Sequence, residues 1–200
     1  KVVNNGLVHI NNEFKMNLEE LEALAAKPEN KLMVLCSPHN PVGRVWTKEE
    51  LTAVAEICLK HDVLLVTDEI HADIVYEGYK HYPLLSLDKR YEENFILLTA
   101  PSKTFNVAGL KASMSIIPNK ELREKFEHTQ KAMSLDVRNT FGLECVSAAY
   151  TDEGEEWMKQ EIAYMQKNVD FLEKFVEEQM PGTKMIRPQG TFLCWLDLSE

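Results

Sequence analysis

Cysteine is scarce in this chain of 200 residues, and the four cysteines that occur are scattered. Cys36, Cys58, Cys145 and Cys194 form no C-x-x-C pair and have no histidine at ligand spacing, so neither a zinc site nor a disulfide framework is predicted. Cys36 and Cys194 lie inside apolar, strand-like patterns, where cysteine usually serves as a small buried hydrophobe. We therefore expect no metal site and a structural role for all four thiols.

Nucleotide-binding signatures are also missing. No G-x-G-x-x-G follows an apolar strand-like run, and no G-x-x-x-x-G-K-[ST] occurs anywhere. The first pattern forms the glycine turn of dinucleotide-binding folds, and the second cradles the phosphates of nucleotide triphosphates. Both kinds of site therefore lack support.

Long apolar segments and excess positive charge are absent as well. The longest apolar runs are strand-sized and no charged-then-apolar leader opens the chain, so we expect a cytoplasmic protein without a membrane partner. The formal net charge of −10, with no basic stripe to offset it, argues against a nucleic-acid partner because phosphates would be repelled. With 44% hydrophobic and 27% charged residues, the composition suits a sizeable core, and a first residue that is not Met suggests a piece of a longer protein.

Apolar strand-like runs alternate with amphipathic helical patterns along the chain. Strands are predicted at residues 32–36, 63–66, 95–99 and 112–117. Between the first two, Thr47 and Glu50 form a capping box that starts a helix reaching about Lys60. A strand, helix, strand unit places its two strands in parallel within one sheet. We therefore predict an α/β fold with a mostly parallel sheet flanked by helices.

Further elements are predicted on both sides of that sheet. The first 14 residues suggest a short strand or two with an Asn-rich turn at residues 4–6, and Asn17 caps a helix that ends before Pro28. Asn119 caps a helix reaching about residue 133. The remaining predictions are a helix at about 137–150, a long amphipathic helix from about 153 to the break at 181–182, and strands at 184–187 and 191–198.

Three of the predicted strands end at residues that can carry chemistry. Asn40 follows the first strand in a turn-rich loop, Asp68 and Glu69 end the second, and Lys103 follows the strand that starts at Phe95. Loops at the carboxyl edge of a parallel sheet often hold functional residues. A lysine there can form a Schiff base with a carbonyl cofactor if its surroundings make losing the proton less costly. Each residue also has an ordinary explanation when it is considered alone. Asn40 can be a turn residue, Asp68 a helix-capping acid and Lys103 a solvated loop lysine.

The order of these residues resembles a known family. The motifs N-P-x-G at Asn40, D-E-x-H at Asp68 and S-K-x-x-N-x-x-G at Lys103 are similar to those of fold-type I pyridoxal-phosphate enzymes, the aminotransferase class I/II superfamily. The segments DEIHADI and APSKTFNVAGLK resemble most the MalY/PatB-type cystathionine β-lyases, also called cysteine-S-conjugate β-lyases. The resemblance covers essentially all 200 residues, and it implies an internal part of an enzyme about twice as long.

The resemblance implies a pyridoxal 5′-phosphate site with three main residues. Lys103 would be the catalytic residue, joined to the cofactor as a Schiff base (the internal aldimine) and then acting as general base at the substrate α-carbon. Asp68 would keep the pyridine nitrogen protonated, because a buried carboxylate favours the pyridinium. Asn40 would donate a hydrogen bond to the phenolate oxygen of the cofactor.

Three more residues have cofactor-binding roles implied by position. Ser102 stands where the family contacts the cofactor phosphate, and Lys111 stands where it usually has a phosphate-binding arginine, so a point charge would replace a bidentate fork. His71 stands where many aminotransferases have a tyrosine that meets the phenolate. Two of them have an open alternative, as a turn hydroxyl for Ser102 and a plain loop histidine for His71. With Lys111 in place of arginine, how the phosphate is held stays open.

The activity implied is a C–S β-lyase acting on cystathionine or related cysteine S-conjugates to give a thiol, pyruvate and ammonia. An aminotransferase of the same superfamily, and a regulatory or interaction protein that keeps the fold, are the alternatives. The resemblance also implies a homodimer that acts on a small amino acid. The expected division is a partial large, cofactor-binding domain over 1–152, and a long helix with the start of a smaller α+β domain over 153–200. The isolated chain is expected to be inactive, because the family's upstream phosphate loop, its stacking aromatic and its downstream carboxylate-binding arginine lie outside it.

Overall fold

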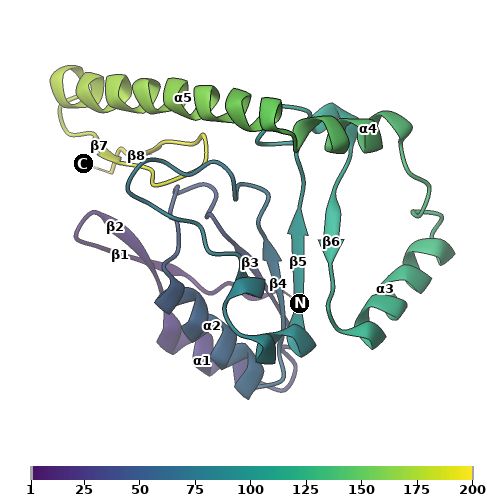
Figure 1. Cartoon of the computed structure of the whole chain (residues 1–200). Helices are drawn as coiled ribbons and strands as arrows, with labels where there is room; N and C mark the ends of the chain where they lie inside the picture. The colour runs from purple at the N-terminus through teal and green to yellow at the C-terminus, as the bar shows by residue number, and fades with distance from the viewer. Residues whose placement is uncertain (1, 200) are drawn as a thin grey trace.

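A four-stranded sheet forms the centre of the computed structural model, which describes residues 2–199 (Figure 1). Its strands are β3 (Leu32–Cys36), β4 (Leu64–Asp68), β5 (Phe95–Thr99) and β6 (Met114–Ile116), in that spatial order. The first three are parallel to one another, and β6 is antiparallel to β5. The predicted α/β fold with a mostly parallel sheet is confirmed.

An antiparallel hairpin precedes the sheet. It consists of β1 (Leu7–Ile10) and β2 (Glu13–Met16), joined by Asn11 and Asn12 at φ of 52° and 61°. Two successive residues at positive φ match the right-handed twist of a two-residue hairpin turn, and asparagine tolerates that conformation. The prediction of a turn at residues 4–6 was therefore wrong, because the turn uses the second Asn pair.

Two capped helices cover one face of the sheet. In α1 (Leu18–Ala25), the side chain of Asn17 accepts a hydrogen bond from Glu20 N at 3.1 Å. In α2 (Lys48–Lys60), Thr47 N donates to the Glu50 carboxylate at 2.8 Å, while Glu50 N donates to Thr47 Oγ1 at 3.2 Å. Both predicted caps are confirmed, since each satisfies orphan N–H groups of a first turn.

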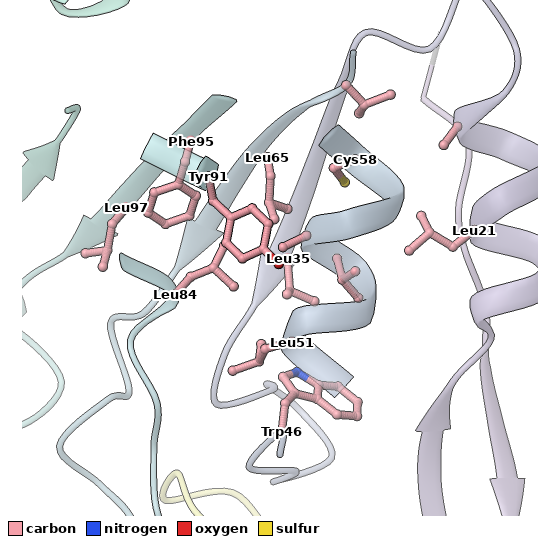
Figure 2. Packing of buried hydrophobic residues seen from close by; sticks show 14 residues of the cluster. Leu21, Leu35, Trp46, Leu51, Cys58, Leu65, Leu84, Tyr91, Phe95 and Leu97 are labelled. Carbon is pink, nitrogen blue, oxygen red and sulfur yellow. The ribbon is translucent and has the colours of Figure 1, made fainter. Parts of the chain in front are cut away.

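The main core lies between these helices and the sheet (Figure 2). Side chains alternate between the two faces of a strand, so Leu65 and Leu97 face α2 while Val66 and Ile96 face the other way. The largest side chain in this core is that of Trp46, which is 1% exposed and donates from its ring N–H to Cys36 O at 2.9 Å. The short helices η1 (Leu84–Ser86) and η2 (Lys89–Asn94) contribute Leu84 and Tyr91 to it.

The second face of the sheet is covered unevenly. Helix α3 (Lys120–Ala132) places Leu122 and Phe126 against it. On β3, however, Leu32 is 54% exposed and Val34 is 64% exposed, although both lie in register with the apolar residues of β4. Parallel sheets are normally covered on both faces, so this part of the sheet is unusually open.

The last part of the chain adds a long helix and a small sheet. After η3 (Ala108–Leu110) and α4 (Thr140–Ala149), helix α5 (Asp152–Gln179) runs along the side toward which β5 points (Figure 1). It is followed by β7 (Lys184–Ile186) and β8 (Trp195–Asp197), which pair antiparallel. The strand predicted over 191–198 is shorter than expected, because Thr191 adopts φ of 67°, and Cys194 therefore precedes the strand. Within residues 2–199, no helix is long and apolar enough to cross a membrane.

Candidate active site

The carboxyl ends of β3, β4 and β5 lie side by side. Asp68, the last residue of β4, is in register with Cys36 of β3 and Leu98 of β5. The ladder continues one residue further, since Ser37 N donates to Asp68 O at 3.0 Å and Glu69 N donates to Leu98 O at 2.8 Å. The three loops that follow these strands therefore leave from one edge of the sheet.

Lys103 lies in the loop after β5, which is a tight turn. Phe105 N donates to Pro101 O at 2.9 Å, and Val107 N donates to Ser102 O at 3.1 Å. Thr104 is fully buried, and its hydroxyl donates to Asp73 Oδ2 at 2.9 Å. That bond joins the loop of Lys103 to the loop that follows Asp68.

The aromatic ring of Phe105 anchors the same turn on its other side. Its centroid lies 5.6 Å from the ring of Tyr150 and 5.8 Å from the ring of Trp157 on α5. Aromatic pairs at such separations stabilise their contact beyond simple area burial. The backbone that carries Lys103 is thus held from two directions.

Lys103, His71 and Asp68 are brought together at this edge. The Lys103 Nζ atom lies 5.8 Å from the centroid of the Phe192 ring, and the ring of His71 lies 5.2 Å from the same ring. Burial, followed by the positive charge of Lys103, lowers the pKa of His71, while the charge of Asp68 acts in the opposite sense. The imidazole is 1% exposed, and its Nδ1 atom has no hydrogen-bond partner among the described residues.

Asp68 itself is only half-buried. Its Oδ1 atom accepts a hydrogen bond from Ile70 N at 3.2 Å, and no other side-chain bond to it occurs within residues 2–199. The carboxylate therefore keeps acceptor capacity for another group.

Asn40 reaches the same edge through Cys36. Asn40 N donates to Cys36 Sγ at 3.4 Å, and Cys36 Sγ donates to Pro38 O at 3.3 Å. Burial raises the pKa of the Cys36 thiol; the hydrogen bond from Asn40 N acts in the opposite sense, and the nearby charge of Asp68 adds to the rise. The Asn40 side chain is exposed and makes no hydrogen bond to the described residues, so its amide remains available.

Ser102 and Lys111 lie further along the loop after β5. Ser102 is half-buried, whereas Lys111 is exposed at φ of 52° and closes η3 by donating from its N to Ala108 O at 3.2 Å. Neither side chain has a hydrogen bond or ion pair within the described part of the chain. Ser102 directly precedes Lys103 in the chain, whereas Lys111 lies at the end of η3.

Phe192 was missed by sequence reasoning. It stands in the P-Q-G-T-F stretch, far from the other site residues in sequence, and a lone phenylalanine there gives no signal of a role. Main-chain bonds bring it in, because Thr191 N donates to Ile74 O at 2.8 Å and Tyr76 N donates to Gln189 O at 3.0 Å. Segment 189–192 thus lies along the loop that follows Asp68.

Among the residues described, no group of three or more His, Cys, Asp or Glu side chains could hold a metal ion, and all four cysteines are free thiols. Arg187, which precedes the P-Q-G-T-F stretch, pairs with Asp170 and Glu173 of α5 and does not enter the site.

Comparison with known proteins gives a consistent result. The family model for aminotransferase class I and II matches residues 5–200. The chain is 38% identical over 198 residues to cystathionine beta-lyase PatB of Bacillus subtilis. The alignment covers 99% of this chain and 51% of PatB. It thus spans about half the length of the curated relatives that it matches.

Solved structures agree with the fold. Cystalysin of Treponema denticola, which contains a pyridoxal 5′-phosphate cofactor, matches with a TM-score of 0.95 at 37% identity over 98% of this chain and 50% of its own. The PLP-bound C-S lyase of Staphylococcus hominis matches with a TM-score of 0.89 at 32% identity, covering 96% of this chain and 48% of its own.

Proposed function

This chain belongs to the aminotransferase class I and II family, and we propose that it forms the middle of a pyridoxal-phosphate-dependent C–S β-lyase about twice its length. The substrate class is cystathionine or related cysteine S-conjugates. The observation that carries the proposal is the gathering of Lys103, His71 and Asp68 at the carboxyl edge of β4 and β5.

The residues present fit pyridoxal 5′-phosphate. Two buried polar atoms near this edge, His71 Nδ1 and Ser37 Oγ, lack partners among the described residues, and buried polar groups normally have them. A polar ligand at this edge would supply such partners, whereas an apolar one would not. A lysine, a carboxylate and a free amide are also the donor set that an aldehyde-bearing pyridine ring requires.

We assign the contacts residue by residue. Lys103 would bond to the cofactor aldehyde, Asp68 would face the ring nitrogen, and Asn40 and His71 would face the phenolate. Ser102 and Lys111 would serve the phosphate, Lys111 as a point charge without the bidentate fork of an arginine. When bound, the cofactor supplies an electron sink for the electron pair left at the substrate α-carbon.

The protein's own groups handle protons and charge. The Lys103 amine takes the proton from the substrate α-carbon as general base. The carboxylate of Asp68 balances positive charge at the sheet edge, and His71 stays neutral because burial and Lys103 both lower its pKa. A neutral imidazole can hydrogen-bond to an oxygen without adding a second cation beside Lys103.

The overall reaction balances with water as the second substrate. Cystathionine and water give homocysteine, pyruvate and ammonia, since the Cβ–S bond breaks and the sulfur leaves as a thiolate. The Phe192 ring forms an apolar wall beside Lys103, which suits the thioether part of such a substrate.

Transamination is the second candidate, because the same proton removal by Lys103 begins it. A regulatory protein that keeps the fold is a third, and it is disfavoured because Lys103 and Asp68 are both present at the site. We further propose that residues 1–152 belong to the cofactor-binding domain, that 153–200 lead into a smaller one, and that the enzyme works as a cytoplasmic homodimer.

One assay separates these candidates. The complete enzyme is incubated with cystathionine and an added acceptor keto acid. Free thiol, pyruvate and the amino acid formed from the acceptor are quantified for the unsubstituted protein, Lys103→Ala and the control Lys120→Ala. Lys120 is exposed and, within residues 2–199, pairs only with Glu124 one turn along α3. We expect thiol and pyruvate from the first and third proteins and neither from Lys103→Ala. Amino-group transfer to a keto acid would identify an aminotransferase, and no product at all would favour the regulatory protein.

A further inference from the structure

A buried arginine joins three separate parts of the chain. The side chain of Arg44 is only 8% exposed. Its Nη2 atom donates to both carboxylate oxygens of Glu50 at 2.7 Å, and its Nη1 atom donates to Glu13 Oε1 at 2.7 Å and to Gln189 Oε1 at 2.8 Å. We call Arg44, Glu13, Glu50 and Gln189 the Arg44 clamp. It connects the N-terminal hairpin, the start of α2 and the C-terminal segment.

Gln189 is bound at almost every polar atom. Its Oε1 atom accepts from Arg44 and also from Val45 N at 3.0 Å, while its Nε2 atom donates to Glu13 Oε1 at 3.2 Å. Its main-chain N donates to Gly43 O at 2.8 Å. A glutamine with so many partners, one of them a buried cation, has little freedom to move.

The two residues after Gln189 transmit that placement. A Cβ atom at Gly190 would lie 2.7 Å from Ile74 O and 2.8 Å from Val45 Cγ2, so the backbone there is packed directly against its neighbours. Thr191 is fully buried at φ of 67°. A β-branched residue at positive φ is costly and persists only where the surroundings determine it.

Phe192 comes next, and its ring meets the site. The Lys103 amine lies 5.8 Å from its centroid and the buried ring of His71 lies 5.2 Å from it, while the exposed fraction of Phe192 is 44%. One part of the ring thus lies against the site and another part is open. Because Phe192 follows segment 189–191 directly, a shift of that segment would move the ring.

Holding the hairpin to α2 does not by itself require Gln189. The two carboxylates already neutralise Arg44, and Glu50 also caps α2 through Thr47 N. Gln189 adds no charge, yet it takes part through three side-chain bonds. Its participation is explained if the clamp serves to place the segment immediately after Gln189.

We propose that Arg44 and Gln189 are positioning residues for the Lys103 site, which fix segment 190–192 so that the Phe192 ring lies against Lys103 and His71. The inference rests on the proposed role of Lys103. Loosening the clamp lets the ring shift, so the Lys103 amine is less well placed for proton transfer and kcat falls more than KM changes.

The test compares matched glutamine substitutions in the complete enzyme. Gln189→Met keeps the length of the side chain but removes its three side-chain hydrogen bonds. Gln166→Met is the control, because Gln166 makes a single side-chain bond, to Asp170 at 3.1 Å on α5. We expect kcat to fall at least tenfold for Gln189→Met and to stay within twofold for Gln166→Met. Amide hydrogen exchange at Gly190 and Thr191 should rise in the same order.

A double-mutant cycle asks whether the clamp acts through Phe192. Phe192→Leu removes the ring and leaves the clamp. If the clamp acts through the ring, the double variant with Gln189→Met is no slower than the slower single variant, within twofold. Losses in kcat that multiply would overturn the proposal. If Gln189→Met melts too low to assay, Glu13→Gln weakens the same clamp with an acceptor retained, and the same cycle with Phe192→Leu decides.

A chemical readout separates this inference from the proposed function. Cofactor-free protein is treated with pyridoxal 5′-phosphate and borohydride, and labelled lysines are identified by peptide mapping. We expect Lys103 to be labelled, and several-fold more slowly in Gln189→Met. If Lys103 is not labelled in the unsubstituted protein, the proposed function fails. If it is labelled equally fast in both proteins and kcat is unchanged, the positioning role alone fails.

Discussion

Two adjacent carboxylates at the end of β4 should respond to substitution in opposite ways. Glu69 is 2% exposed, and its carboxylate accepts hydrogen bonds from Thr67 Oγ1 at 3.0 Å and Leu84 N at 3.1 Å and lies 2.8 Å from His81 Nε2. Asp68 is half-buried with one local bond, to Ile70 N. We predict that Glu69 serves stability and that Asp68 serves activity.

The magnitudes depend on the partners left behind. Glu69→Leu leaves the buried Leu84 N–H and the His81 ring unpaired, at roughly 1–3 kcal/mol each, so the free energy of unfolding should fall by about 2–6 kcal/mol. In the complete enzyme, about twice the length of this chain, that corresponds to a drop in Tm of roughly 2–7 °C. Asp68→Asn keeps an oxygen for Ile70 N, so stability should change by less than about 1 kcal/mol. Its kcat/KM should nevertheless fall on the order of 100-fold, because the charge that we propose to face the cofactor ring nitrogen is lost.

The assay pairs thermal melts with kinetics in the complete enzyme. Melts are recorded on cofactor-free protein, because a bound cofactor adds its own stabilisation and would mix the two effects. Glu69→Gln is the control, since it keeps the acceptor for Leu84 N and should lose less than Glu69→Leu. The reasoning is refuted if Glu69→Leu has the same Tm as the unsubstituted protein, or if Asp68→Asn lowers the Tm while kcat/KM is retained.

Three further predictions concern single groups. Burial raises the pKa of Cys58 to about 12, so Cys58 should resist iodoacetamide at pH 8 in native protein and react after denaturation, as mass spectrometry of digests would show; ready labelling of native protein would contradict its burial. Thr104→Val removes the bond to Asp73 and should lower the free energy of unfolding by about 1.5–3 kcal/mol, whereas Thr104→Ser should retain most of it; urea melts that show equal losses would contradict this. Because the pKa of His71 in the folded protein lies below its ordinary value of 6.5, the unfolded chain binds more protons as pH falls past that value and stability is lost there. His71→Gln should therefore flatten the fall in Tm between about pH 7 and pH 5, and an unchanged slope would show that His71 does not contribute.

Much of the fold could be predicted because its signals are local. The Thr47 and Glu50 capping box, and Asn17 and Asn119 before their helices, were readable since a cap needs only the residues of one turn. The runs 32–36 and 95–99 agree with β3 and β5 to the residue, because an apolar run of this length bounded by turns specifies a strand. The expected burial holds for the start of β5 but not for Leu32 and Val34 of β3.

The wrong predictions come from competition between similar local patterns. Two Asn-containing stretches could each turn the N-terminal segment, and residue spacing alone did not favour the pair at 11–12. Residues 191–194 carry a strand-like pattern. However, Thr191 N donates to Ile74 O and Tyr76 Oη donates to Thr191 O, so this segment is bound to the loop after β4 and β8 begins only after it. Contacts of that kind join residues more than 100 positions apart, so no local window contains them.

The site residues likewise differ in whether the sequence could predict them. The ends of β3, β4 and β5 point to one edge as soon as the strands are parallel, so Asn40, Asp68 and Lys103 could be grouped from sequence. Phe192 and the Arg44 clamp could not, because the bond between Arg44 and Gln189 spans 145 positions.

The immediate surroundings of Lys103 therefore come from two parts of the chain: the loops that carry the motifs, and a segment that lies beyond α5. The loops after β4 and β5 supply the charges, and the bond between Thr104 and Asp73 holds those loops to each other. The aromatic ring comes from beyond α5, and its placement depends on a buried cation at the far end of a different loop. Because motif residues alone fix the charges and not the ring, relatives with the same three motifs can differ in how closely an apolar surface meets the lysine. Differences in reaction among such relatives are then expected to map to segment 189–192 and its clamp as much as to the motifs themselves.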